Sequence, residues 1–418
     1  MERSSHKKSI LSWCLYDAGN SAFATVIVTF VFSVYFARSI VGDETNGAAL
    51  WSYAIATSGF VVALASPVLG AMADHYGARK PGLVLFSALC VVPCALLYFA
   101  APGMVVLALV LFVVAHTGFE IALVYANAML PHIAPPRMVG RISGWAWGAG
   151  YAGGLACLAM TLFGLVGLGD INPLLSLPRA HFEHIRAAAP LTALWFALFT
   201  IPLLLWTHDV EKTGLKITEA VRKGLFQLRD TFTRARQQKN LLTFLIASAL
   251  YRDGLNTLFA VGGLYAAGVF GMSLTEILIF AIGLNVSAGL GAVIFAYADD
   301  HWGSKRTVIV ALVGMIVTGL AILLTQDKHV FTVLALALGI FMGPAQAASR
   351  TLAARLSPPD MVAQTYGLYS FTGKSVSFLG PLAFGLATSI FDSQRAGMAT
   401  IILFWLAGLA LLAKVRET

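Results

Sequence analysis

Two ionisable residues lie deep inside apolar stretches, and they are the first candidates for chemistry. Lys374 stands in "YSFTGKSVSFLG", and Glu120 stands in "HTGFEIALVYA". A charged side chain at the centre of a bilayer costs about 3 kcal/mol even on insertion scales, so it indicates a function by default. Lys374 needs an anion, either a static buried partner such as Glu120 or Asp253 or an acidic group on a bound solute. Both interpretations stay open.

His116 lies one helical turn before Glu120, on the same face of an expected helix. An imidazole and a carboxyl group one turn apart are able to pass a proton. A Glu120 side chain bonded to neighbouring Ser, Tyr or Trp groups would give the same sequence pattern. The pair is therefore a hypothesis for proton coupling with a structural alternative.

Two further carboxylates each precede an asparagine by three residues: Asp17 with Asn20, and Asp253 with Asn256. Residues at i and i+3 share a helix face, so each pair presents a carboxylate and an amide together. Such patches would contact a solute or couple protons. Alternatively, the two carboxylates act as latches that bind loop amides or basic residues near the inner membrane surface.

The segments that hold these residues are apolar enough to cross a membrane. The chain is 58% hydrophobic and 11% charged, whereas soluble domains carry about 25% charged residues. A helix of about 20 apolar residues spans the hydrocarbon core, and twelve such segments are expected. They lie near 12–38, 49–71, 82–101, 104–127, 142–167, 191–206, 241–268, 274–297, 307–325, 329–350, 363–390 and 396–413.

The net charge of +8 comes from Lys and Arg residues that concentrate on alternate loops. This is the positive-inside pattern of a membrane protein, and it predicts that both termini are cytoplasmic. The surroundings are then a lipid bilayer, and no nucleic-acid partner is expected. No phosphate-binding loop, nucleophile elbow or His-Glu-x-x-His pattern occurs in the sequence, so we expect neither an enzyme nor a cofactor or metal site.

Three pairs of segments show an internal repeat. "DAGNSAF" matches "DGLNTLF", "DHYGARK" matches "DHWGSKR", and "APPRMVGRISG" matches "SPPDMVAQTYG", always in the same order. The repeat divides the chain into a six-span half at 1–206, a linker with an amphipathic helix at 207–240, and a second six-span half at 241–418. It also aligns Tyr151 with Lys374, so Tyr151 joins the solute-contact candidates, while Gly150 and Gly154 suit close helix packing.

The repeated loops resemble the gating motif of the major facilitator superfamily, Asp-x-x-Gly-x-basic-basic after the second span of each half. The resemblance implies an all-α polytopic membrane protein with twelve transmembrane helices in two halves. It assigns a gating role to two sets of residues: Gly70, Asp74, Gly77, Arg79 and Lys80, then Asp300, Gly303, Lys305 and Arg306.

Longer segments, including "WCLYDAGNSAFATVIVTFVF", "GPAQAASR" and "YGLYSFTGKSVSFLGPLAFG", are similar to the vacuole-effluxer-like branch. That branch groups unassigned bacterial facilitators with autophagy-related amino-acid exporters of fungal vacuoles. The resemblance implies a monomeric secondary transporter of the bacterial inner membrane that works by alternating access. We expect it to move a small polar metabolite, with amino-acid export as one form, and to use protons. Alternatives are efflux of amphipathic compounds and a receptor-like homologue that moves no solute.

Overall fold

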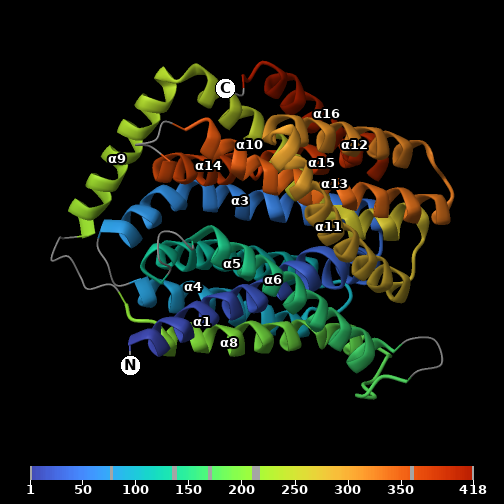
Figure 1. Cartoon of the computed structure of the whole chain (residues 1–418). Coiled ribbons are helices and arrows are strands. Elements are labelled where there is room, and N and C mark those ends of the chain that lie inside the picture. The colour runs from blue at the N-terminus through green and yellow to red at the C-terminus, as the bar shows by residue number, and fades with distance from the viewer. Residues whose placement is uncertain are drawn as a thin grey trace. The chain divides into compact units, whose positions relative to one another are not determined.

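The structure is a computed structural model, and it describes residues 2–75, 79–133, 139–167, 172–209, 217–357 and 362–416. All regular structure within these ranges is helical (Figure 1). The helices up to the linker are α1 (Glu2–Ala22), η1 (Phe23–Phe30), α2 (Phe32–Tyr35), η2 (Phe36–Val41), α3 (Glu44–His75), α4 (Arg79–Leu96), η3 (Leu97–Phe99), α5 (Val105–Ile133), α6 (Val139–Thr161), η5 (Leu162–Val166), α7 (Glu183–Arg186) and α8 (Ala188–Trp206).

The remaining helices are α9 (Ile217–Gln237), α10 (Lys239–Phe270), α11 (Leu274–Trp302), α12 (Ser304–Leu324), α13 (Lys328–Arg355), α14 (Val362–Val376), α15 (Leu379–Phe391) and α16 (Gln394–Ala413). Eleven segments of the described residues are long and apolar enough to cross a membrane. α10 is 32 residues long but is not among them, because Arg252, Asp253 and Asn256 reduce its hydropathy. The eleven segments and α10 together match the twelve segments expected from the sequence.

The helices group into two compact units. One comprises Met1–Gly47 with Leu64–Phe226, and the other comprises Ala48–Ala63 with Gln227–Thr418. In the first unit α1 packs on α6 and α8, α4 packs on α5, and α4 also contacts α8. In the second unit α10 packs on α14, α15 and α16, α12 packs on α13, and α12 also contacts α16. The same pairing therefore occurs in each unit, as the sequence repeat predicts.

Glycines bring α1 and α6 close together. A Cβ atom at Gly153 would overlap the backbone carbonyl of Ala18, and one at Gly154 would lie 2.9 Å from the hydroxyl of Thr25. Close packing of small residues lets helices associate in an apolar environment, where the hydrophobic effect between helices is absent. The expected packing role of this glycine segment is confirmed.

Helices that correspond in the two halves differ in how regular they are. The first membrane segment, Lys7–Val41, passes from α1 into two π-helical stretches, η1 and η2, whereas its counterpart α10 is one continuous α-helix. The eleventh of the twelve segments, Thr365–Phe391, consists of two helices, α14 and α15, separated by Ser377 and Phe378. This break lies next to Lys374 and positions the site described below.

Candidate functional site

Among the candidate residues whose burial the structure describes, Asp253 is the most deeply buried. Its side chain is on α10 and the residue is 1% exposed. One carboxylate oxygen accepts a hydrogen bond of 2.8 Å from the backbone N–H of Gly380, the second residue of α15. The other carboxylate oxygen has no hydrogen-bond partner among the described residues. Asp253 therefore binds the start of the second half of a broken helix.

A helix start is a favourable place for this carboxylate. The first N–H groups of a helix have no partner within it, and the helix dipole places partial positive charge there. Phe378 precedes α15 and supplies no side-chain cap, so Asp253 supplies one from another helix. Gly380 lets the start of α15 lie close to α10, because a Cβ at this position would overlap the hydroxyl of Thr257.

Lys374 occupies the other side of the break. It is half-buried in the last turn of α14. Its backbone carbonyl accepts hydrogen bonds from the backbone N–H of Ser377 (3.4 Å) and from the Ser377 hydroxyl (3.0 Å). The C-terminal end of a helix carries partial negative charge and stabilises a cation. The break thus has a cation at the end of α14 and a carboxylate at the start of α15.

Arg252 packs on α14 one turn before Lys374. Its guanidinium carbon lies 4.0 Å from the centroid of the Tyr369 ring, and its Nη1 donates to the Tyr369 carbonyl at 2.9 Å. A Cβ at Gly373 would lie 2.8 Å from that same nitrogen. No sequence pattern predicts this arrangement, because cation–π contacts between distant segments have no fixed spacing.

The expected carboxylate–amide pairs do not have equivalent surroundings. Asp253 is buried but Asn256 is exposed. In the first unit the order is reversed, since Asn20 is 4% exposed and Asp17 is half-buried. Asp17 lies beside α6, where a Cβ at Gly150 would be 3.2 Å from its carboxylate oxygen. The structure therefore does not bring the two pairs into one repeated pattern.

His116 lies in an aromatic cluster on α5. The residue is 8% exposed, and its ring centroid lies 5.4 Å from that of Phe112 and 5.8 Å from that of Phe119. This environment supports a packing role for the imidazole ring. Glu120 on α5 and Tyr151 on α6 are half-buried, and a role for any of the three in proton or solute binding stays a prediction.

The gating motif of the first unit uses a carboxylate that lies outside the motif. Asp209, just after α8, accepts the backbone N–H groups of Arg79 and Lys80 at 2.8 Å and 3.1 Å, and so caps the start of α4. The Lys80 ammonium donates to the carbonyls of Leu204 and Thr207, both at 2.6 Å. Sequence spacing did not identify Asp209, because this residue lies 130 positions after Arg79 in the chain.

In the second unit Lys305 has a similar partner. Its ammonium donates to the carbonyl of Ala413 at the end of α16, at 3.2 Å. Each unit therefore ties a motif lysine to the carbonyl end of its own last membrane helix.

Two motif glycines have different surroundings. Gly303 has a φ of 85°, a conformation that favours glycine. Gly70 faces open space, where a Cβ would meet nothing within 4 Å.

Some of the motif lies outside what the structure describes. Gly77 is outside the described residues, as are the side chains of Asp74 and Asp300. Arg306 is exposed. The gating roles of these residues remain predictions.

Comparison with known proteins identifies the family. Residues 33–417 match the model of the family described as "Vacuole effluxer Atg22 like". The chain belongs to this family. It is 27% identical over 413 residues to an uncharacterised MFS-type transporter, YxiO, of Bacillus subtilis, covering 97% of this chain and 94% of the relative. It is 24% identical to autophagy-related protein 22 of Coccidioides immitis, covering 87% and 72% of the two chains.

Solved structures show the same fold for this Atg22-like protein. A D-xylose–proton symporter superimposes with a TM-score of 0.71 at 12% identity, covering 98% of both chains. A bacterial homologue of the human lysosomal transporter Spinster, in an inward-facing unoccupied conformation, gives 0.69 at 15% identity, covering 98% of this chain and 96% of the other. The predicted major facilitator fold and family are confirmed. The protein is a multi-pass membrane transporter and not an enzyme.

Proposed function

We propose that this transporter moves a small polar, zwitterionic metabolite of the amino-acid class by alternating access, with proton coupling. The observation that carries the proposal is the break in the eleventh membrane segment, which has Lys374 on one side and Asp253 bound to the other. Discontinuous membrane helices build solute and ion sites in secondary transporters, because their free ends present dipoles and backbone groups within the membrane.

The charged groups beside the break between α14 and α15 are complementary to those of a zwitterion. The Lys374 ammonium is a partner for a solute carboxylate, and the start of α15 offers further N–H donors. The buried Asp253 carboxylate, with one oxygen not hydrogen-bonded among the described residues, is a partner for a solute ammonium group. A neutral sugar or an apolar compound offers neither a carboxylate to Lys374 nor an ammonium group to Asp253, so it fits this pair of charges less well than a zwitterion does.

Asp253 is also suited to proton coupling. Protonation removes the negative charge that the start of α15 stabilises and so weakens the link between α10 and α15. Since Gly380 is held by this one carboxylate, binding of a proton would change how firmly α15 is fixed. Glu120 and His116 remain a second proton-coupling prediction.

Reconstitution into proteoliposomes tests the proposal. The parent protein should accumulate radiolabelled amino acids in response to an imposed pH gradient. Asp253→Asn should lose gradient-driven accumulation by at least about tenfold, because the amide cannot exchange a proton. Solute counterflow should weaken as well, because the amide carries no charge to pair with the solute ammonium group.

Asp392→Asn is the matched control. Asp392 lies at the opposite end of α15, is exposed, and has a φ of 47°, a conformation that Asn adopts readily. The substitution removes one carboxylate charge at the far end of α15 and should leave accumulation unchanged. Equal accumulation by the parent and Asp253→Asn would contradict proton coupling at this residue, and no amino-acid uptake at all would contradict the solute class.

The proposal includes the orientation and direction. The distribution of Lys and Arg supports placing both termini in the cytoplasm of a cell with the protein in its inner membrane. The word "effluxer" in the family description supports export. Labelling of a single cysteine introduced at the exposed Lys7 with an impermeant reagent tests this, and labelling in intact cells would contradict it.

A further inference from the structure

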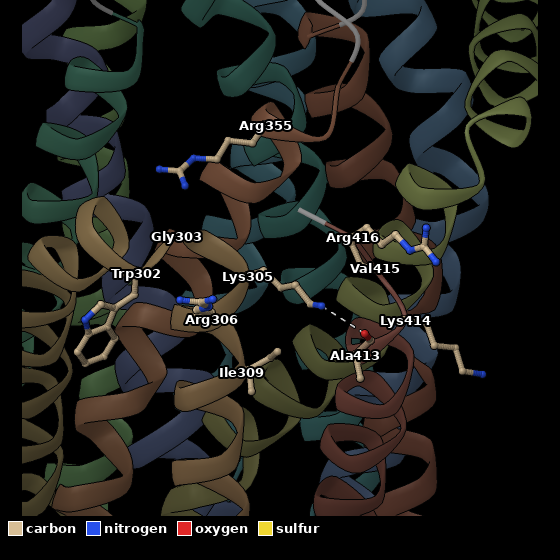
Figure 2. A pocket seen from close by; sticks show the side chains of 10 residues that line it. All are labelled: Trp302, Gly303, Lys305, Arg306, Ile309, Arg355, Ala413, Lys414, Val415 and Arg416. Atoms are coloured by element: carbon tan, nitrogen blue, oxygen red, sulfur yellow. Dashed lines mark hydrogen bonds between the residues drawn. The ribbon is translucent and has the colours of Figure 1, made fainter. Parts of the chain in front are cut away.

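A basic hollow opens in the second unit where several membrane helices end. It has a volume of about 1200 Å³ and includes Trp302 at the end of α11 and five basic residues. These are Lys305, Arg306, Arg355, Lys414 and Arg416. Figure 2 shows Arg306 and Arg355 extending toward the side where Trp302 lies, with Lys414 and Arg416 on the opposite rim and directed away.

The walls of the hollow are held in place by hydrogen bonds. Arg416 donates its backbone N–H to Asn240 at 2.7 Å and accepts from the Asn240 amide at 2.5 Å. Val415, the residue before Arg416, is fully buried. The Lys305 ammonium reaches the Ala413 carbonyl at 3.2 Å, as Figure 2 shows. Hydrogen bonds from Asn240, Arg416 and Lys305 therefore hold the walls of the hollow.

Its electrostatic potential favours an anion. Five basic residues contribute to its lining, and no acidic residue is among the described residues that do. The first residues of α12, including Lys305 and Arg306, also belong to the lining, so the positive end of that helix dipole faces the same region. Arginine presents a planar fork of N–H groups that fits phosphate oxygens in pairs.

The surroundings favour a lipid as the source of that anion. Trp302 is 53% exposed, and tryptophan is enriched where a membrane meets water. Along α12, starting four residues after Arg306, Val310, Val313 and Val317 are 40%, 44% and 60% exposed. This spacing places them on one helix face. Acyl chains on that face would hold a headgroup at the level of Arg306.

We propose that this hollow binds the phosphate of an anionic phospholipid, with Arg306 and Arg355 as its main ligands and Trp302 beside the glycerol region. The five basic residues lie on the side predicted to be cytoplasmic, where anionic lipids attract basic clusters. The proposal does not depend on the transported solute, because it concerns a separate part of the second unit.

Native mass spectrometry of the full-length protein in detergent tests it. Phosphatidylglycerol should bind more tightly than phosphatidylcholine with identical acyl chains. In Arg306→Gln/Arg355→Gln, binding of phosphatidylglycerol should weaken by roughly thirtyfold, since each basic residue near a membrane surface contributes about fivefold. The control Arg229→Gln/Arg236→Gln removes the same charge from exposed positions on α9 and should bind as the parent does.

Three results would overturn the proposal. These are equal binding of the two lipids, equal loss in the pocket and control variants, and displacement of phosphatidylglycerol by an equal concentration of inorganic phosphate. The last would identify a soluble anion as the ligand.

A second measurement leaves the basic residues intact, in case the double variant does not fold. Phosphatidylglycerol with brominated acyl chains should quench tryptophan fluorescence more than brominated phosphatidylcholine does. The excess should disappear in Trp302→Phe. An excess that persists in Trp302→Phe, or no excess in the parent, would contradict a lipid at this position.

Discussion

Asp17 and Asp253 occupy the same place in two repeated segments, yet their surroundings differ. Asp253 is fully buried and caps the start of α15, whereas Asp17 is half-buried beside a glycine of α6. The helices differ too, since the first membrane segment contains π-helical turns and α10 contains none. A repeat in sequence thus preserves which residue types are present without preserving how deeply they are buried.

The different burial of Asp17 and Asp253 leads us to expect different roles for the two carboxylates. A buried carboxylate that holds a helix end responds strongly to a proton or a counter-ion, because the surrounding dielectric is low. A half-buried carboxylate is screened by its surroundings and responds less. We therefore expect changes near Asp253 to have larger effects than the equivalent changes near Asp17.

Lys374→Met should give the largest effect. Transport of an amino acid should fall by roughly tenfold or more, because a charge-assisted contact to a solute contributes about 1.5–3 kcal/mol. Tyr151→Phe alters the aligned residue of the first unit and should change transport by less than about twofold. Flux into proteoliposomes measures both, and similar losses in the two variants would show that the halves contribute equally.

Gly380→Ala should be the next most damaging. Its Cβ would overlap the Thr257 hydroxyl and lie 3.1 Å from the backbone oxygen of Asp253, so α15 must move away from α10. Overpacking of this kind costs about 1–3 kcal/mol, and transport should fall with it. The control Gly367→Ala, on α14, meets nothing within 4 Å and should unfold at the same or a higher temperature than the parent. A Gly380→Ala protein as stable as Gly367→Ala would refute the tight contact.

Gly150→Ala applies the same change to the first unit. The new Cβ would lie 2.6 Å from the Ser21 hydroxyl and 3.2 Å from the Asp17 carboxylate. Both contacts are with side chains that can rotate, so we expect a smaller loss, about 1 kcal/mol. Gly148→Ala, with no atom within 4 Å, is its control. Thermal unfolding in one detergent compares all four glycine variants, and a loss larger than that of Gly380→Ala would reverse the proposed order.

Asp209→Ala should have the smallest of these effects. It removes the cap at the start of α4, and because the Lys80 contacts to α8 remain, we expect a cost near the low end for a lost cap, about 0.5 kcal/mol. Asp230→Ala breaks only an exposed pair with Arg234 and should change stability by less than about 0.5 kcal/mol. Indistinguishable unfolding temperatures for the two variants would mean that Asp209 does not stabilise α4.

The fold was largely predictable from the sequence, but the centre of the candidate site was not. Hydropathy located the spans, because a bilayer imposes length and apolarity on each helix. The break after Val376 was missed, although Gly380 followed by Pro381 was a signal, since proline suits the first turn of a helix.

Burial and capping partners could not be read from spacing. Asp253 and Asn256 share a helix face by period, yet one is buried and the other exposed, because the neighbouring helix covers only part of that face. Asp209 caps a helix that begins about 130 residues earlier, and no local pattern records which distant segment supplies a cap.

The gap between α14 and α15 has a mechanical consequence. α15 contains 13 residues, so it is a rod of about 20 Å at 1.5 Å per residue. Two rods joined by two residues form a lever, and a rotation of about 10° at the joint would carry the far end of α15 through about 3 Å. Loss or gain of one hydrogen bond at Gly380 could thus be converted into a displacement at Asp392, on the opposite end of the helix, without bending either rod.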